Sequence, residues 1–317
     1  MSVLTVCLNP TLQKTLCFSK IVPGTVNRTG VHRLDASGKG INVTRVLTQL
    51  GKKAVHLTQL GGVMRPLFLS LCEQDGLSVE WVESKSQIRF CYTILTEEDA
   101  VTNGNDTVFN TTELVEESEP VGADTEQRLL ENFNSLLSKQ DFSSLIISGT
   151  KAAGFSDSII PTMVRKAKEK GLKVILDIRG KDLIESLPYK PDIIKPNLYE
   201  FASTFAADLA AGNKFIGDDA AAERRIKFAA IDLCKKYGCR VILTDGSRKI
   251  RAADGDDLFE IDIQPVKAVN NIGSGDAFTA GLASALEAGA SFREAISEGI
   301  RCGTLNAELI KPGVVSG

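Results

Sequence analysis

The sequence has 317 residues, of which 43% are hydrophobic and 24% charged, and its formal net charge is −3 at pH 7. These values are typical of a soluble globular protein with one large domain, or one domain and a small appendage. The lack of a basic excess argues against nucleic-acid binding, and no apolar run is long enough to span a membrane. Residues 1–9 are apolar without a basic leader, so we predict a first strand there and not a signal peptide.

The cysteines and histidines argue against several kinds of site. Seven cysteines are scattered along the chain, mostly within apolar runs. This spacing predicts reduced, mostly buried thiols in a cytoplasmic protein. His32 and His56 are the only histidines, so a histidine-based zinc site or a Ser-His-Asp triad is not expected.

The first part of the chain predicts a strand, a small β flap and the start of a core. The strand ends at Asn9-Pro10. Two extended, partly alternating segments follow, and Pro23-Gly24 forms a turn between them. We then expect a helix that opens on a Gly-rich turn and stops at Gly51. The predicted strands of this part cover 3–8, 15–18, 25–34, 55–60, 78–82 and 89–95. The predicted helices cover 36–50 and 67–74. Residues 97–121 are predicted to form a polar loop with an edge strand.

From residue 126 onward, the pattern alternates between helices and strands. Such alternation is typical of a parallel sheet that is covered by helices on both faces. The predicted helices cover 126–138, 157–170, 198–206, 220–237, 277–288 and 292–310, and the predicted strands cover 144–148, 173–177, 192–195, 240–244 and 258–269.

The residues Gly273-Ser274-Gly275-Asp276 are the strongest candidates for chemistry. They predict a glycine-rich turn that opens a helix, where glycines let an anion approach the backbone and the first N–H groups point outward. Asp276 would lie in this anion-binding turn, where its carboxylate could accept a proton from an attacking hydroxyl. A plain helix cap with Asp276 as a first-turn acid is the alternative interpretation.

Spacing argues against two other glycine-rich motifs at this turn. A dinucleotide fingerprint requires a third glycine where this chain has Phe278. A P-loop requires Gly-Lys followed by Ser or Thr, and neither Gly38-Lys39 nor Gly51-Lys52 meets that condition.

Polar residues follow most of the predicted strands. In open α/β sheets, ligands bind outside the carboxyl ends of the strands, so we expect these residues to lie near a ligand. One such stretch alone is weak support, but their joint occurrence predicts an enzyme. The stretches are Asn9 with Gln13, Gly61-Gly62, 148–151, Asp177, 195–197, 245–247 and 273–276.

The ordered motifs resemble those of the ribokinase-type carbohydrate kinases, and most closely the branch of 1-phosphofructokinase and tagatose-6-phosphate kinase. The resemblance covers essentially the whole chain. It rests on Gly38-Lys39-Gly40-Ile41-Asn42-Val43, Ser148-Gly149, Lys195-Pro196-Asn197 with Glu200, Asp245-Gly246, Gly273-Ser274-Gly275-Asp276, residues 8–15 and residues 303–308.

The resemblance implies phosphoryl transfer from ATP to a sugar hydroxyl. Asp276 would be the base, and Gly273, Ser274 and Gly275 would form the anion hole. The sugar would be held by residues that include Gln13, Gly38, Lys39, Asn42, Ser148 and Lys151. ATP would contact Lys195, Asn197, Asp245, Gly246 and Asn306.

Asn197 and Glu200 match a motif that the family uses for Mg²⁺. Asn followed three residues later by Glu is also a helix capping box, and the two interpretations are compatible. Asn42 and Asn306 also have plain alternatives, as a polar group inside a helix and as an ordinary helix residue.

Four cations are expected around the sugar pocket. Arg28 and Arg89 match positions that hold the phosphate already on the sugar, and Lys39 and Lys151 would add charge. Arginine suits this task because its planar fork binds phosphate oxygens in pairs. We therefore expect a ketose monophosphate, such as fructose 1-phosphate or tagatose 6-phosphate. Any single one of the four could instead be a solvated surface charge.

Three departures from the branch concern the identity of the sugar. Gln13 stands where the branch usually has aspartate. Thr150-Lys151 replaces Ser-Leu in a conserved turn of the family. The glycine pair at 61–62 is followed by Val63, where the branch more often has another glycine. These differences do not affect the expected reaction.

The predicted architecture is a single domain over 1–317, a three-layer α/β/α core with a mostly parallel sheet and a small β lid. The lid strands are expected at about 12–35 and 88–112. Apolar residues of the flap predict a homodimer through the lid. Two other functions remain open, namely a kinase of an unphosphorylated sugar or nucleoside, and a non-catalytic sugar-phosphate sensor. Asp276 argues against the sensor, which needs no base.

Overall fold

The computed structural model describes residues 2–97, 109–212, 214–217 and 220–316. Internal contacts divide the chain into two compact units. The first unit comprises Met1–Leu4, Leu130–Thr150 and Phe155–Pro265, and the second comprises Thr5–Leu129, Lys151–Gly154 and Val266–Gly317. Strand β1 (Ser2–Val6) begins in the first unit and ends in the second.

The first unit contains six neighbouring strands, in the order β15-β14-β13-β10-β9-β8. The pairs from β8 to β13 are parallel, whereas β14 and β15 add an antiparallel hairpin. The parallel strands are mostly buried and have apolar centres, as expected for strands covered on both faces. The strands are β8 (Phe142–Ser148), β9 (Lys173–Asp177), β10 (Ile193–Ile194), β13 (Arg240–Thr244), β14 (Lys249–Asp254) and β15 (Asp257–Asp262).

Helices connect the strands of the first unit. They are α4 (Ile159–Glu169), α5 (Gly180–Ser186), α6 (Leu198–Phe205) and α7 (Ala220–Tyr237). Helix α3 (Thr125–Lys139) begins in the second unit and continues in the first. The turns η1 (Leu187–Tyr189) and η2 (Ala207–Leu209) and the strands β11 (Ala210–Ala211) and β12 (Lys214–Phe215) complete the unit.

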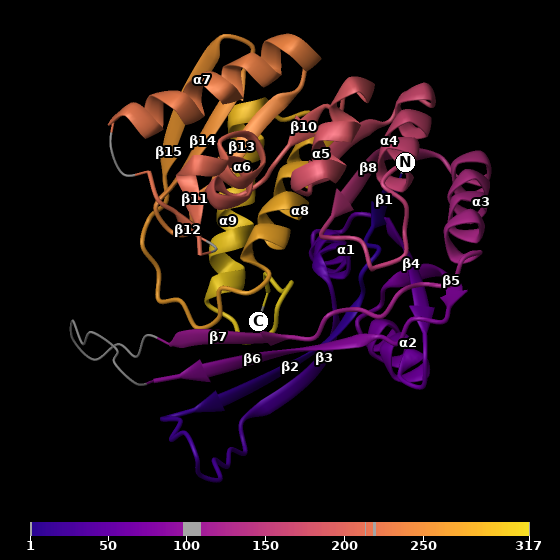
Figure 1. Cartoon of the computed structure of the whole chain (residues 1–317), viewed down its shortest axis with the longest axis vertical. Coiled ribbons are helices and arrows are strands. Elements are labelled where there is room, and N and C mark those ends of the chain that lie inside the picture. The colour runs from indigo at the N-terminus through magenta and orange to yellow at the C-terminus, as the bar shows by residue number, and fades with distance from the viewer. Residues whose placement is uncertain (1, 98–108, 213, 218–219, 317) are drawn as a thin grey trace. The chain divides into compact units, whose positions relative to one another are not determined.

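In the second unit, the strands β4 (Ala54–Gly61) and β5 (Ser78–Ser84) are parallel; helix α1 contacts β4, helix α2 contacts β5, and α8 packs between α1 and α9 (Figure 1). The helices are α1 (Lys39–Gln49), α2 (Arg65–Gln74), α8 (Ser274–Glu287) and α9 (Phe292–Ala307). Helices α8 and α9 pack closely, because a Cβ at Gly281 would lie only 2.7 Å from the carbonyl oxygen of Glu298. Helix α8 also packs against α1.

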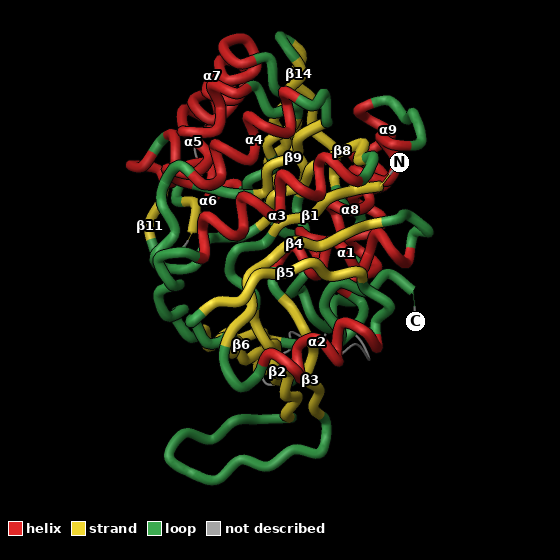
Figure 2. Tube along the Cα trace, turned by 90° about the vertical axis from the view of Figure 1, so that its right-hand side faces the viewer, coloured by secondary structure: helices red, strands yellow, loops and turns green. Residues whose placement is uncertain are grey.

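The lid is a four-stranded sheet within the second unit, in the order β3-β2-β6-β7. Its strands are β2 (Thr11–Phe18), β3 (His32–Ser37), β6 (Arg89–Thr96) and β7 (Asn110–Val115). The central pair β2–β6 is parallel, and the two outer pairs are antiparallel. Its base joins the core through Leu12, which packs with Ile41 and Phe68. Figure 2 shows the long loop between β2 and β3 extending away from the strands.

The predicted fold class, an α/β core with a mostly parallel sheet and a β lid, is confirmed. All seven cysteines are free, and all except the partly exposed Cys17 are buried, as predicted. No helix in the described part of the chain could span a membrane. The predicted strand bounds were least accurate in the lid, where residues 25–31 form a loop instead of a strand. Part of the predicted lid segment 88–112 lies outside the described residues.

The predicted strand at 258–269 was also inaccurate. The structure has the hairpin β14–β15 over Lys249–Asp262 instead. Asp254-Gly255 is a turn signal that indicates this hairpin, and Gly255 has the required positive φ of 64°. Helix α5 was not predicted, because its seven residues are too few for a clear helical period.

Candidate active site

The turn before α8 has the geometry of an anion-binding site. Gly273 is the N-cap, with a left-handed φ of 82°, and a Cβ there would lie 2.9 Å from the backbone nitrogen of Gly313. Only glycine therefore fits. No side chain caps the helix, and Gly275 is exposed. The first N–H groups of α8 thus face a side from which an anion can approach.

Asp276 lies in the first turn of α8, with a side chain that is 5% exposed. Its Oδ2 accepts a hydrogen bond of 2.8 Å from Nδ2 of Asn42. The bond joins two glycine-rich motifs that are 234 residues apart in the sequence. The motif that begins at Gly38 and the turn at Gly273 therefore form one site in the second unit.

The end of β1 closes one side of this site. Gly38 has a φ of 106°, and a Cβ there would lie 3.3 Å from Sγ of Cys7. Burial raises the pKa of the Cys7 thiol, and the nearby charges of Arg89 and Asp276 act on it in opposite directions. Cys7 therefore lies within electrostatic reach of both Arg89 and Asp276.

The inner face of the lid is polar and buried next to β1. Gln13 is 3% exposed, and its Nε2 donates to Oγ1 of Thr93 at 2.5 Å. Arg89 begins β6 and donates from Nη1 to the carbonyl oxygen of Glu116 at 3.0 Å. Its Nε is buried and has no hydrogen-bond partner among the described residues. A buried, unsatisfied donor is unfavourable, so this nitrogen is suited to an anionic ligand.

Two of the other predicted cations also belong to the second unit. Lys39 is the first residue of α1. Lys151 precedes Ala152, whose N–H donates to the carbonyl oxygen of Leu8 at 3.2 Å, beside the end of β1. Both lysines make further interactions within the protein.

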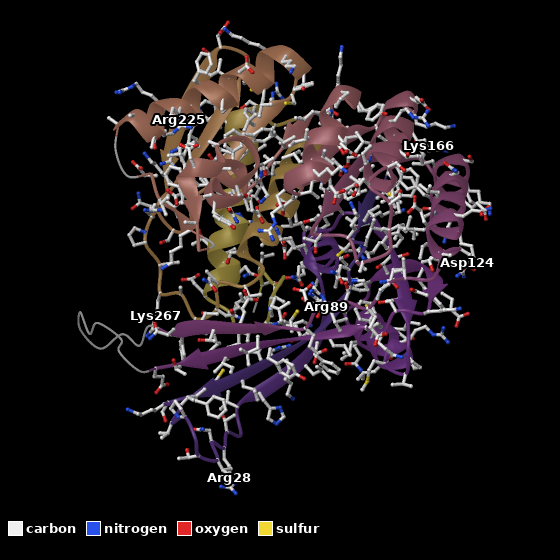
Figure 3. All side chains as sticks on the ribbon, viewed as in Figure 1. Arg28, Arg89, Asp124, Lys166, Arg225 and Lys267 are labelled. Atoms are coloured by element: carbon white, nitrogen blue, oxygen red, sulfur yellow. The ribbon has the colours of Figure 1, made fainter. Side chains whose placement is uncertain are left out.

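Arg28 does not join this group within one chain. It is exposed on the loop that follows β2, and Figure 3 shows it at the outer tip of that loop, well away from Arg89. Arg89 pairs in register with Thr11, at the opposite end of the lid strands. The predicted gathering of four cations is therefore not formed within a single chain, although a role for Arg28 stays a prediction.

In the first unit, the predicted residues Ser148 and Lys195 meet at Asp177. Oγ of Ser148 donates to Oδ2 of Asp177 at 3.1 Å, and Nζ of Lys195 lies 3.3 Å from Oδ1. All three side chains are almost fully buried. A buried lysine needs such a partner to remain charged. Contacts of Ser148 with sugar and of Lys195 with ATP stay predictions.

Asn197 and Glu200 form a complete capping box at the start of α6. Oδ1 of Asn197 accepts from the N–H of Glu200 at 2.7 Å, and a carboxylate oxygen of Glu200 accepts from the N–H of Asn197 at 2.9 Å. The capping interpretation is confirmed. One carboxylate and one amide also fit an Mg²⁺ that keeps most of its water and is shared with phosphate oxygens.

Asp245 and Gly246 follow β13 and lie beside the capping box, because Asn197 and Thr244 form a parallel bridge. Gly246 is exposed with a φ of 57°. The carboxylate of Asp245 is nearly buried and accepts from Nη1 of Arg251 at 3.1 Å and from Nη2 of Arg248 at 2.5 Å. Within the first unit, the predicted nucleotide residues therefore cluster at the carboxyl ends of β10 and β13.

Asn306 is fully buried, with 0% exposure. Its Nδ2 donates to the carbonyl oxygen of Ile272 at 2.9 Å and to Oγ of Ser274 at 3.2 Å, while its Oδ1 accepts from the N–H of Gly313 at 2.7 Å. The side chain therefore connects the turn before α8 to the C-terminal segment. A position near adenine stays a prediction.

Sequence reasoning missed Arg45 and Asp75, which form an ion pair at 2.7 Å between the buried guanidinium of Arg45 and the partly exposed carboxylate of Asp75. Helical spacing places Arg45 one turn after Asn42 on α1, but it does not indicate that an arginine is buried there. Asp75 follows a different helix, and nothing in the sequence pairs the two residues.

The comparisons with known proteins identify the family and the fold. The family model for pfkB family carbohydrate kinases matches residues 13–313. A possible 1-phosphofructokinase from Thermotoga maritima has a TM-score of 0.82 with 21% identity over 98% of this chain and 93% of its own. Phosphofructokinase-2 from Escherichia coli, in complex with substrates and products, has a TM-score of 0.81 with 21% identity over 97% and 93%.

A more distant neighbour is the ribokinase of Arabidopsis thaliana, complexed with ribose and ATP. Its TM-score is 0.68, with 17% identity over 98% of this chain and 94% of its own. At these identities the solved structures support the fold, whereas the family model identifies the chain. With its match over nearly the full length, the chain belongs to the pfkB family of carbohydrate kinases.

Proposed function

We propose that this protein transfers the γ-phosphoryl group of ATP to a hydroxyl of a ketose monophosphate. The observation that carries the proposal is the hydrogen bond between Asn42 and Asp276. It holds a nearly buried carboxylate beside the exposed backbone of the turn at Gly275. A base and an anion-binding turn are the two groups that such a transfer needs side by side.

In the proposed reaction, Asp276 accepts the proton of the attacking hydroxyl. The hydroxyl oxygen forms a bond to the γ-phosphorus as the bond to the leaving ADP oxygen breaks. The N–H groups at the start of α8 stabilise the negative charge on the transferring group. Because phosphoryl transfer depends mainly on positioning and electrostatics, no covalent enzyme intermediate is required.

The nucleotide would bind at the cluster of Lys195, Asn197 and Asp245. Mg²⁺ would be held near Asn197 and Glu200 together with the ATP phosphates, where it neutralises phosphate charge. The capping box supports this assignment only in part, because it also fixes the start of α6 without any metal.

Arg89 supports a substrate that already carries a phosphate. Its buried Nε lacks a partner among the described residues, and its charge lies near Cys7 at the base of the site. A free sugar offers neutral hydroxyls, whereas a sugar phosphate offers an anion to this guanidinium. The amide of Gln13 carries no charge, and its Nε2 donates to Thr93. Gln13 therefore suits a hydroxyl of the same sugar better than its phosphate.

A coupled assay of ADP release tests the function. Wild-type protein is given Mg-ATP with fructose 1-phosphate, tagatose 6-phosphate, free fructose, ribose or a nucleoside. We expect the highest kcat/KM with a ketose monophosphate. The highest kcat/KM with a free sugar or a nucleoside would instead favour a kinase of an unphosphorylated sugar or nucleoside. Binding of a sugar phosphate without ADP release from any acceptor would favour the sensor.

We further propose that the protein forms a homodimer through the lid. Leu16, Phe18, Tyr92 and Ile94 lie on one face of β2 and β6 and are only half-buried, and Val26 and Val31 of the adjoining loop are exposed. A four-stranded sheet with such a face is expected to pair with another apolar surface. We expect light scattering at micromolar concentration to give twice the monomer mass.

The substitution Leu16→Glu places a charge on this face and should shift the protein to monomers. Phe228→Glu is the matched control, because Phe228 is 74% exposed on α7 and outside the lid. It should leave the mass unchanged. A monomeric wild-type protein, or a Leu16→Glu variant that remains dimeric, would contradict the lid interface.

A further inference from the structure

Arg45 determines which way the amide of Asn42 points. The guanidinium is buried, with 3% exposure, and its Nη1 donates to Oδ1 of Asn42 at 2.9 Å. A guanidinium has donors only, so the atom of Asn42 that faces it must be the oxygen. Oγ of Ser37 donates to the same oxygen at 3.2 Å. The Nδ2 group must then face the other way, toward Oδ2 of Asp276.

The remaining donors of Arg45 fix it in one place. Its Nε donates to Oδ2 of Asp75 at 2.7 Å, its Nη1 also donates to the carbonyl oxygen of Pro312 at 3.1 Å, and its Nη2 donates to the carbonyl oxygen of Ala36. The guanidinium thus contacts three separate parts of the second unit. Because a buried charge without partners is strongly unfavourable, this set of bonds leaves Arg45 few alternative positions.

Asp75 in turn is held by two cations. Lys311 bonds to its Oδ1 while Arg45 bonds to Oδ2. Burial raises the pKa of Asp75, but Arg45 and Lys311 outweigh that effect and bring the pKa below its ordinary value. Asp75 therefore stays ionised near neutral pH and keeps Arg45 in place. The C-terminal segment joins this network through both Lys311 and Pro312.

We propose that Arg45 is a positioning residue, which holds the Asn42 amide with its Nδ2 toward Asp276 and so keeps that carboxylate oriented to accept a proton. This inference rests on the proposed function of Asp276. Without Arg45, the amide can rotate and present Oδ1 to the carboxylate. Two acceptor oxygens then face each other, a contact that is favourable only when Asp276 is protonated and unable to act as a base.

The variant Arg45→Met tests the proposal by kinetics. It removes the donors but keeps an apolar chain of similar length, and Asp75 retains Lys311 as a partner. A misplaced catalytic group can reduce turnover by about a hundredfold, so we expect kcat to fall by about 10–100-fold and the KM for ATP to change less than about twofold. Arg45→Lys should recover only part of kcat, because an ammonium cannot reach all of these acceptors.

Gln49→Ala is the matched control. Gln49 also lies on α1 and binds the C-terminal segment, since its Nε2 donates to the carbonyl oxygen of Gly313 at 3.1 Å. Among the described residues, Gln49 forms no hydrogen bond with Asn42. We expect its kcat to stay within about twofold of wild type. An equal loss in Gln49→Ala and Arg45→Met would show that loosening the C-terminal segment accounts for the effect, and would overturn the proposal.

A double-mutant cycle separates positioning from general damage. If Arg45 acts through Asn42, then adding Arg45→Met to the Asn42→Ala variant should change kcat by less than about threefold. If the loss of kcat in the double variant equals the product of the losses in the two single variants, the proposal is overturned. If Arg45→Met does not fold, Asp75→Asn takes its place in the same cycle, with the same expected non-additivity.

Nuclear magnetic resonance provides a readout that does not depend on activity. The side-chain amide of Asn42 is identified as the signal that Asn42→Ala lacks. In wild-type protein one of its protons should exchange slowly with solvent, and this protection should be lost in Arg45→Met. Unchanged protection would overturn the proposal. If no acceptor is phosphorylated by the wild type, the proposed function fails, and this measurement still decides whether Arg45 orients the amide.

Discussion

The variant Asp276→Asn is expected to reduce kcat by about 10³–10⁴-fold, the upper part of the range for loss of a general base. An asparagine at this position retains a side-chain oxygen that can accept from Nδ2 of Asn42, so the local fold should persist. It has no basic oxygen for the proton of the attacking hydroxyl. Because the change affects the transition state and not ground-state binding, the KM values for sugar phosphate and ATP should change less than about threefold.

The control for this prediction is Asp192→Asn, which makes the same chemical change elsewhere. Asp192 lies in the first unit and accepts from Nζ of Lys168 at 2.6 Å and from the N–H of Val174 at 2.7 Å. The turnover of the Asp192→Asn variant should stay within about twofold of wild type. The role of Asp276 as a base is contradicted if Asp276→Asn, with an unchanged melting temperature, keeps more than a tenth of the wild-type turnover.

The local parts of this site could be predicted from the sequence. Glycines at 38 and 273 lie just before helical patterns, and both have the left-handed or otherwise positive φ that favours glycine. The capping box at Asn197 follows from a spacing of three residues. Such features depend on neighbours in the chain, so the sequence contains all the information they require.

The long-range parts could not be predicted in the same way. The strand-end rule and the family resemblance bring Asn42 and Asp276 to one site, but neither indicates that Asn42 donates to Asp276. The burial of Arg45 depends on Asp75 and on the carbonyl oxygen of Pro312, which is 267 residues away. The position of Arg28 could not be predicted either, because a motif match does not determine where the end of a long loop lies.

The second large effect is expected in the choice of sugar. Charge-assisted hydrogen bonds are worth about 1.5–3 kcal/mol each, and about 1.4 kcal/mol corresponds to a tenfold change. Two such bonds to a sugar phosphate would therefore give roughly a hundredfold preference, or more, over the free sugar. We expect kcat/KM for fructose 1-phosphate or tagatose 6-phosphate to exceed that for free fructose by at least this factor.

Arg89→Ala should remove most of this preference. We expect the KM for the sugar phosphate to rise by about a hundredfold and the KM for ATP to stay within about twofold, because Arg89 is proposed to bind the phosphate of the sugar and the substitution changes none of the predicted nucleotide residues. The variant also removes a buried Nε that has no partner among the described residues. Stability should therefore fall less than is usual for the loss of a buried, fully bonded side chain.

Arg65→Ala is the matched control, since it removes the same charge from the second unit. Arg65 is at the start of α2, where it pairs with Glu83 at 2.7 Å and lies over the ring of Trp81. Neither KM should change by more than about twofold. If free fructose or ribose is phosphorylated as efficiently as any sugar phosphate, or if Arg89→Ala and Arg65→Ala behave alike, Arg89 does not bind a substrate phosphate. A kinase of an unphosphorylated sugar would then be the better description of this site, with Asp276 and the turn at Gly273 retaining their roles.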